Sequence, residues 1–310
     1  MIFVYSPCSN NDLIQRHGLK KRIFFTGVTS IHGYPVFSAF LNEPDCEVFG
    51  IRPPKVHEPS GANVISCCIT NRDMLYHIRK TFQPTHVIHC AGVCDLDVCE
   101  ERPHWAQAMN TDGANAVTEV FNDTARIIYL SADLVFSGNT SPDKGYNECC
   151  IPDPVSVAGK TIAAAEKIIE QCDNACVVRL GLPIGTSVTG TKGAIDFVES
   201  RFKRNLPVTL FLDEFRSCIQ FSDIVKSVMA IVNLDIRGYW HLGGPVKYSL
   251  YSIGKYVLDK KGYPASLLRG IMRKDEQNGP PRMGDVSLDS SKLGSLLGFS
   301  FRDGLSVLLN

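Results

Sequence analysis

Apolar residues in the first two thirds of the chain form short runs that alternate with longer amphipathic stretches. Five runs have the length and the Val, Ile and Phe content of strands: 22–26, 47–51, 86–90, 126–130 and 176–180. Three stretches have helical spacing: 72–82, 105–121 and 160–171. Strands that are apolar on both faces and alternate with helices are typical of a parallel sheet covered on both sides. The pattern therefore predicts an α/β fold with a Rossmann-type, doubly wound parallel sheet.

The pattern changes after residue 185. Shorter segments follow, with helical spacing at 195–202, 222–232 and 250–261 and strand character at 207–211 and 238–242. We expect these segments to form a smaller C-terminal lobe that closes over the edge of the sheet. The chain then divides into an N-terminal extension (1–21), a Rossmann domain (22–185) and a lobe (186–310), with some intermixing of the last two.

Composition narrows the class of protein. Hydrophobic residues make up 44% of the 310, which suffices for a large core, and Lys plus Arg equals Asp plus Glu at 32 each. The zero net charge provides no overall basic field for nucleic acid or an anionic membrane. No apolar run approaches the ~20 residues that cross a bilayer, and Tyr5 and Ser6 interrupt the apolar start too early for a signal peptide. We expect a cytoplasmic protein that binds neither nucleic acid nor membrane.

The chain has twelve cysteines, but their spacing does not suit a metal. No C-x-x-C occurs, and no pair of histidines has zinc-finger spacing. Cys90 lies within an apolar run, where cysteine behaves as a small hydrophobic residue. We expect reduced structural thiols and no metal.

A glycine-containing turn follows the first predicted strand. Gly27 and Gly33 hold the outer positions of a G-x-x-G-x-x-G pattern, Ser30 holds the middle one, and Ile31 lies within the turn. Such a turn at the start of a helix directs backbone N–H groups at a pyrophosphate. The middle glycine normally allows close approach, so Ser30 predicts a weakened dinucleotide site, although its hydroxyl is able to bond a phosphate. An ordinary tight turn between strand and helix explains the same residues.

Arg52 follows the second predicted strand, where NAD-preferring proteins carry an acid that accepts hydrogen bonds from the ribose. An arginine at this place pairs with a 2′-phosphate instead, which favours NADP. The alternative is a solvated arginine ahead of Pro53 and Pro54. The sequence therefore predicts NADP, at a weakened site, as the cofactor.

Several motifs extend this interpretation. Residues 89–100 are H-C-A-G-V-C-D-L-D-V-C-E, 131–136 are S-A-D-L-V-F, and 154–162 are P-V-S-V-A-G-K-T-I. Together with 213–216, 240–245 and 281–293, they resemble the dTDP-4-dehydrorhamnose reductase branch of the extended short-chain dehydrogenases/reductases in order and spacing. That branch includes the regulatory β subunit of methionine adenosyltransferase. The resemblance covers about residues 22–310.

The resemblance implies a substrate-binding role for the smaller lobe and a set of ligand contacts. The cofactor-binding positions are Gly27, Ser30, Ile31, Gly33, Arg52, Ile69, Ala91, Gly92, Asn110 and Pro183. At Ile69, the backbone N–H replaces an aspartate that relatives use beside adenine. Arg216 and Arg282 lie where relatives bind the acidic part of a substrate or an interface, which implies a phosphate-clamping role, with surface ion pairing as the alternative.

The family's hydride-transfer chemistry needs a Thr or Ser, a Tyr, and a Lys four residues after the Tyr. The resemblance places Ala132, Ala158 and Ile162 at these positions, with Ser131 and Lys160 as residual polar neighbours. A shifted register would pair Ser156 with Lys160, or use Tyr146, but would break the Gly-Lys-Thr match. We therefore expect no intact catalytic side chain, and positioned acid–base groups typically contribute ~10²–10⁴-fold each.

Three hypotheses follow. In the first, the chain is a non-catalytic scaffold that binds a dinucleotide or nucleotide-sugar and acts through a partner enzyme or as a homodimer. In the second, it is an active NADP-dependent reductase of a keto-sugar nucleotide, or an enzyme with atypical chemistry in the same cleft. In the third, it no longer binds a dinucleotide and binds another ligand in the pocket that relatives use for one. The sequence names neither partner nor substrate, since a fold alone does not determine function.

Overall fold

The centre of the molecule is a seven-stranded sheet in which every neighbouring pair of strands is parallel. The computed structural model describes residues 20–57, 59–185, 187 and 193–309, so most of the predicted extension 1–21 lies outside the described residues. The strand order is β10-β6-β5-β4-β1-β2-β3. The strands are β1 (Lys21–Thr26), β2 (Cys46–Arg52), β3 (Val64–Ser66), β4 (His86–His89), β5 (Arg126–Ala132), β6 (Ala175–Leu180) and β10 (Gly238–Leu242). The predicted Rossmann-type fold is confirmed.

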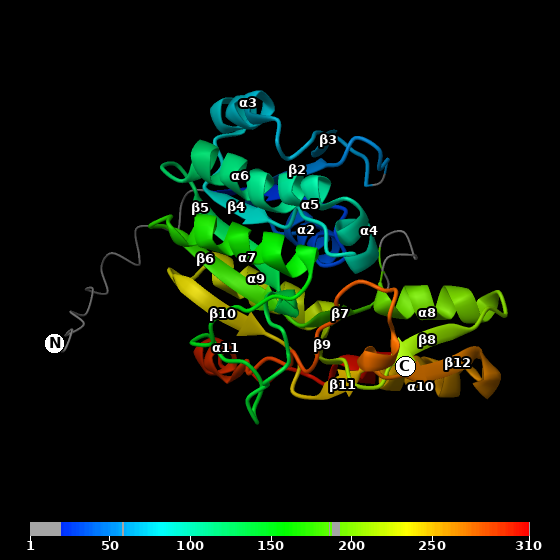
Figure 1. Ribbon diagram of the computed structural model, residues 1–310. Helices are drawn as coiled ribbons and strands as arrows, with labels where there is room; N and C mark the ends of the chain where they lie inside the picture. Colours follow the sequence, from blue (N-terminus) through cyan, green and yellow to red (C-terminus); the bar gives the residue numbers. More distant parts are fainter. Residues whose placement is uncertain (1–19, 58, 186, 188–192, 310) are drawn as a thin grey trace.

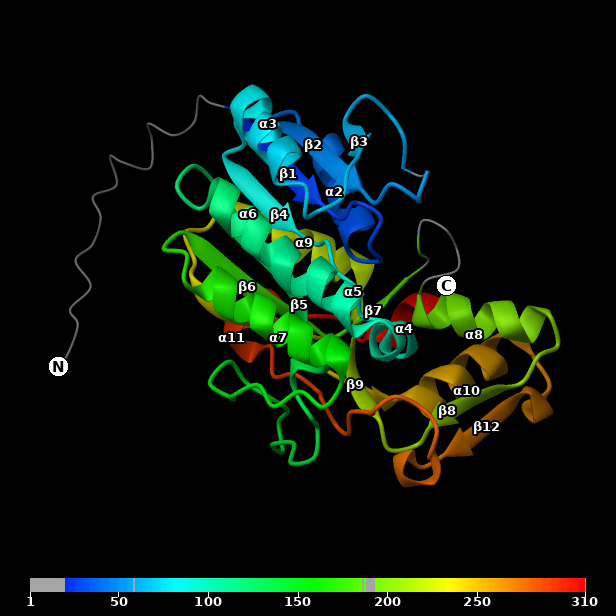
Figure 2. The ribbon, with the colours of Figure 1, turned by 45° about the horizontal axis from the view of Figure 1, so that its top comes forward.

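Helices cover both faces of this sheet (Figure 1). On one face α2 (Gly33–Leu41) packs beside α9 (Phe221–Val232). On the other lie α3 (Arg72–Phe82), α6 (Gly113–Phe121) and α7 (Val157–Glu170), which Figure 2 shows in front of the central strands. Each face has its own apolar cluster. This burial on both sides explains why the central strands are continuous apolar runs.

The helix predicted over 105–121 is three pieces. They are α5 (Pro103–Gln107), a π turn called η1 (Ala108–Asp112), and α6. Short α4 (Leu96–Glu101) precedes them. Hydrophobic spacing did not show this interruption because one wide turn shifts the apolar stripe only slightly.

A smaller lobe lies beside the sheet (Figure 2). Its strands are β7 (Leu182–Ile184), β9 (Phe215–Gln220) and β11 (Lys247–Ser249) in one small sheet, and β8 (Val208–Phe211) and β12 (Leu268–Ile271) in another. Its helices α8 (Ala194–Lys203) and α10 (Leu250–Lys261) pack on each other, whereas α11 (Ser291–Leu297) contacts β10.

The two parts of the chain intermix. Both α9 and β10 follow residue 185, yet α9 covers the large sheet and β10 pairs with β6. By joining β6, β10 covers backbone groups that an edge strand would leave unpaired.

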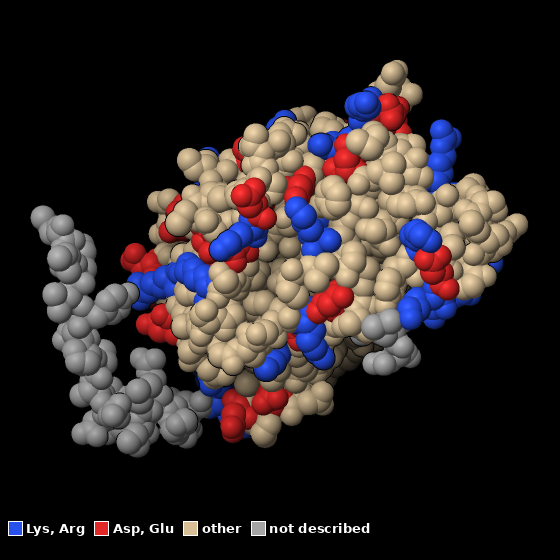
Figure 3. Space-filling model, turned by 90° about the horizontal axis from the view of Figure 1, so that it is seen from below, with Lys and Arg blue, Asp and Glu red and all other residues tan. Residues whose placement is uncertain are grey.

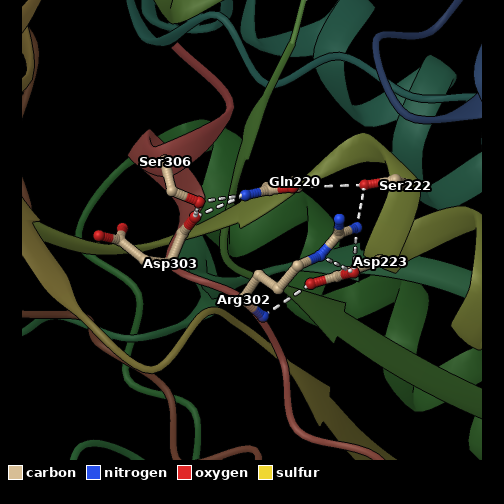
Figure 4. A network of polar contacts seen from close by, with 6 residues as sticks. All are labelled: Gln220, Ser222, Asp223, Arg302, Asp303 and Ser306. Carbon is tan, nitrogen blue, oxygen red and sulfur yellow. Dashed lines mark hydrogen bonds and ion pairs between the residues drawn. The ribbon is translucent and has the colours of Figure 1, made fainter. Parts of the chain in front are cut away.

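The end of the chain is fastened to the junction of β9 and α9 (Figure 4). Gln220 Nε2 donates hydrogen bonds to the Asp303 carbonyl and to Ser306 Oγ, each at 2.7 Å. Arg302 forms an ion pair with the buried Asp223 at 2.7 Å. These contacts fasten the C-terminal segment to the end of β9 and the start of α9.

The surface agrees with the balanced composition. Lys and Arg are interspersed with Asp and Glu over the face drawn in Figure 3, which carries no large patch of one sign. Among the described helices, none has the length and apolar character needed to cross a membrane.

Helix α7 is fixed tightly against the sheet. A Cβ at Gly159 would lie 2.2 Å from the Leu134 carbonyl oxygen, so the helix backbone approaches this segment directly. Glu166 of α7 pairs with Arg179 of β6 at 2.8 Å, and both side chains are almost fully buried. The position of α7 is therefore set by close packing and by a buried ion pair.

We predict that Gly159→Ala destabilises the fold, although alanine normally favours a helix over glycine by about 1 kcal/mol. The added methyl group would overlap the Leu134 carbonyl, and overpacking typically costs about 1–3 kcal/mol. The free energy of unfolding measured in urea checks this sign. A stabilised Gly159→Ala variant would contradict the described packing of α7.

Candidate active-site cleft

The glycine turn and the end of β4 meet without side chains between them. Gly27 has φ +71°, and a Cβ there would lie 2.6 Å from the Ala91 Cα. The Thr26 hydroxyl accepts the N–H groups of Cys90 and Ala91 at 3.2 and 3.3 Å. Gly27 is thus required both for its left-handed backbone and for close approach to β4.

The turn retains some free hydrogen-bond donors. Ser30 Oγ accepts the Gly33 N–H at 2.9 Å, so one donor at the start of α2 is already occupied. The N–H groups of Ile31 and His32 make no hydrogen bond within the described residues. A pair of N–H groups at the start of a helix suits two phosphate oxygens. Burial lowers the pKa of His32 to about 4, so its imidazole is neutral near pH 7.

The expected adenosine contacts lie at the ends of β2 and β3. Arg52 Nη1 donates to the Val56 carbonyl, while its Nε is buried without a partner in the described part of the chain. The Ile69 side chain lies in the core, where a Cβ on Gly113 would be 2.9 Å from it. The backbone N–H of Ile69 has no hydrogen-bond partner among the residues described, so no protein acceptor competes with a ligand for it.

Asn110 lies in η1 and is 2% exposed. A Cβ on Gly92 would lie 3.0 Å from Asn110 Oδ1, which places the amide directly beside this loop. On the lobe side, Pro183 lies in β7, and a Cβ on Gly193 would be 3.2 Å from Ile31 Cδ1. The structure thus gathers the turn, the β4 loop and Asn110, with the start of α8 touching the turn.

Ala132, Ala158 and Ile162 belong to one apolar cluster. Ala158 is 0% exposed and Ile162 is 6% exposed, and Ala132 packs against the same group. Its other members include Leu96 and Met283. These three positions therefore contribute hydrocarbon packing and no polar side-chain group.

The residual polar neighbours have other partners. Ser131 Oγ donates to the buried Glu166 at 2.5 Å, and Ser156 caps α7 by accepting the Gly159 N–H at 3.1 Å. Lys160 is exposed, and its ammonium makes no hydrogen bond to Ser156 among the described residues.

Tyr146 stacks on Phe136 with ring centroids 4.1 Å apart, and burial raises the pKa of Tyr146. A catalytic tyrosine requires the opposite shift in pKa. Burial thus disfavours the ionised form of Tyr146.

Both arginines expected to bind substrate are held by buried carboxylates. Arg216 forms a bidentate ion pair with Asp133, in which Arg216 Nε lies 2.6 Å from Asp133 Oδ2. Arg282 pairs with Glu214 at 2.7 Å and covers the Phe211 ring. Asp133 is 0% exposed and Glu214 is 1% exposed. An anionic substrate would have to compete with these carboxylates for both cations.

Sequence reasoning missed these carboxylates. Asp133 lies inside the S-A-D-L-V-F motif that carried the resemblance, and Glu214 lies beside Arg216. No periodic signal links residues that are 83 positions apart, as Asp133 and Arg216 are.

Other features of the described residues do not alter this site. No group of three or more His, Cys, Asp or Glu residues suited to a metal occurs within the described ranges. A separate cavity of about 820 Å³ is lined by Gly243, Ser290 and Phe299, among others, and includes none of the predicted cofactor-binding residues.

The sheet, the glycine turn at its carboxyl edge and the attached lobe define an extended short-chain dehydrogenase/reductase class of Rossmann protein. The family described as RmlD substrate binding domain matches residues 22–307, so the chain belongs to that family. The resemblance inferred from the motifs is confirmed.

Curated proteins with similar sequences include a subunit by name and a probable reductase by name. Methionine adenosyltransferase 2 subunit beta of Bos taurus is 27% identical over 290 residues, covering 89% of this chain and 82% of that protein. The probable low-salt glycan biosynthesis reductase Agl14 of Haloferax volcanii is 24% identical and covers 77% of this chain and 82% of its own.

Solved structures share the fold. The dTDP-4-dehydrorhamnose reductase of Bacillus anthracis, in complex with NADP, has a TM-score of 0.78 at 18% identity and covers 94% of this chain and 97% of its own. The Bordetella bronchiseptica enzyme WbmG, in complex with NAD and UDP, has a TM-score of 0.77 at 21% identity, with 94% of each chain covered.

We predict that Asp133→Asn destabilises the protein by about 3–5 kcal/mol, because it leaves the Arg216 guanidinium buried without its counter-ion. Asp259→Asn is the control, since Asp259 forms an exposed pair with Lys255 that solvent screens, so little change in stability is expected. Urea denaturation of both variants measures the difference. Equal losses would show that Arg216 is not held by Asp133.

Proposed function

We propose that this chain is a non-catalytic, nucleotide-binding scaffold of its family and that it regulates a partner enzyme. The observation that supports this proposal most strongly is the apolar cluster around Ala158 and Ile162, where the family's proton-transfer groups are expected. Neither a phenol nor an ammonium group occupies these positions, so hydride transfer lacks its acid–base assistance.

The nucleotide proposed for the cleft is NADP. Free N–H groups at Ile31 and His32 suit the pyrophosphate, the Ile69 N–H suits adenine, and Arg52 suits a 2′-phosphate. The reductase relative in complex with NADP supports this assignment. The cofactor would supply hydride chemistry in an active relative, but here its proposed role is to order the cleft.

The partner is proposed from the curated relatives. Several are named methionine adenosyltransferase 2 subunit beta, and they cover most of this chain. Gel filtration of the chain alone, and mixed with a methionine adenosyltransferase, separates a mixed assembly from a homodimer.

We predict that the wild-type chain binds NADPH more tightly than NADH and does not oxidise it with a dTDP-4-keto sugar. Binding is measured by fluorescence titration, and turnover by absorbance at the nicotinamide band. The rate should fall at least ~10²–10⁴-fold below that of an active reductase assayed in parallel, which is the contribution of one acid–base group.

Two variants separate this proposal from an active enzyme. Turnover that is present in the wild type and lost in Ser131→Ala or Lys160→Ala would establish a reductase with relocated catalytic groups. Absence of NADPH and NADH binding would favour a cleft that has changed its ligand. Either result would refute the proposed scaffold.

We also predict that Ser30→Gly tightens NADPH binding, because it releases the Gly33 N–H and removes a Cβ beside the phosphate. A hydrogen bond to a charged group contributes on the order of 1.5 kcal/mol, equivalent to about tenfold in Kd. Ser30→Ala is the matched variant, since it frees the N–H but keeps the Cβ. Weaker binding in both variants would show that the serine hydroxyl itself holds the phosphate.

A further inference from the structure

The side-chain amide of Asn110 joins the loop after β4 to helix α7. Its Oδ1 accepts the Val93 N–H at 2.7 Å, and its Nδ2 donates to the Val93 carbonyl at 2.9 Å and to Thr161 Oγ1 at 2.8 Å. Because Asn110 is 2% exposed, water does not compete for these bonds. One planar amide therefore fixes the positions of Val93 and Thr161 relative to each other.

On the cleft side, Val93 directly follows Ala91 and Gly92. Ala91 contacts the glycine turn at Gly27, and Gly92 lies beside the Asn110 amide. A nucleotide that binds along this loop orders the segment to which Asn110 is bonded.

On the helix side, Thr161 lies in the second turn of α7. Its hydroxyl donates to the carbonyl of Val157 or Ala158, at 2.9 and 3.0 Å. Its own carbonyl accepts the Thr111 hydroxyl at 3.0 Å. The wide π turn of η1 lets two consecutive side chains, Asn110 and Thr111, reach the same residue of α7.

Other contacts hold α7 without involving the cleft. Ser156 caps the helix, Glu100 accepts the Val157 N–H at 2.7 Å, and Glu166 pairs with Arg179. Removal of the Thr161 hydroxyl therefore leaves the helix folded and affects its link to the loop.

We propose that Asn110 and Thr161 couple nucleotide occupancy of the cleft to the order of the first turns of α7. This inference rests on the proposed function, and it gives the scaffold a nucleotide-dependent surface around the exposed Lys160. A ligand shifts such an equilibrium only by binding the ordered form more tightly, and the rigid amide supplies that preference. Asn110 acts here as a positioning residue.

Hydrogen–deuterium exchange with and without saturating NADPH tests the coupling. In the wild type, NADPH should slow exchange in peptides covering 91–93 and 157–163, by at least about fivefold in the second, the lower end of typical couplings. In Thr161→Val, NADPH should still slow exchange in 91–93 but should no longer slow it in 157–163. Thr161→Ser retains the hydroxyl and should keep both.

Thr111→Val is the control for a merely loosened helix. It removes a bond to the Thr161 carbonyl but none to Val93, so exchange in α7 should rise equally with and without NADPH, leaving the ratio intact. Two results would overturn the coupling but leave nucleotide binding intact. In the first, NADPH still protects α7 in Thr161→Val. In the second, NADPH protects residues 91–93 of the wild type but does not protect α7. If NADPH protects neither segment, both this coupling and the proposed nucleotide binding fail.

Discussion

The close approach of α7 to the sheet is the constraint on which the rest of the cleft depends. Gly159 allows the helix backbone to reach the Leu134 carbonyl, and the buried pair of Glu166 and Arg179 fixes its position. With the helix so placed, Ala158 and Ile162 enter an apolar cluster. At these two positions the helix thus contributes hydrocarbon packing.

The charges of the cleft follow from the same geometry. Asp133 comes directly after β5 and forms an ion pair with Arg216 of β9. This pair links the large sheet to the smaller lobe. Glu214 holds Arg282 in the same way. Within the described residues, the glycine turn keeps backbone N–H donors without partners and Arg52 keeps an unpaired Nε. Such donors suit the phosphates of a nucleotide.

Much of the fold was predictable because its strands are buried on both faces. The five predicted strands match within two residues, and the helix 72–82 matches α3. Three-residue β3 was too short to produce a pattern, and the return of β10 to β6 depends on pairing that no local signal carries. The glycine turn could be placed from sequence, but the partners of Ser30, Arg216 and Thr161 could not, since each depends on side-chain geometry across distant segments.

We propose that this site binds the adenosine half of a dinucleotide and offers no polar side chain to the nicotinamide. Saturation-transfer difference NMR with NADPH tests this most directly, because it reports which ligand protons lie against the protein. We expect strong saturation of the adenine protons and weak saturation of the nicotinamide protons. Equal saturation of both rings would contradict it and would imply that residues near Ala158 still hold the reactive end of the cofactor.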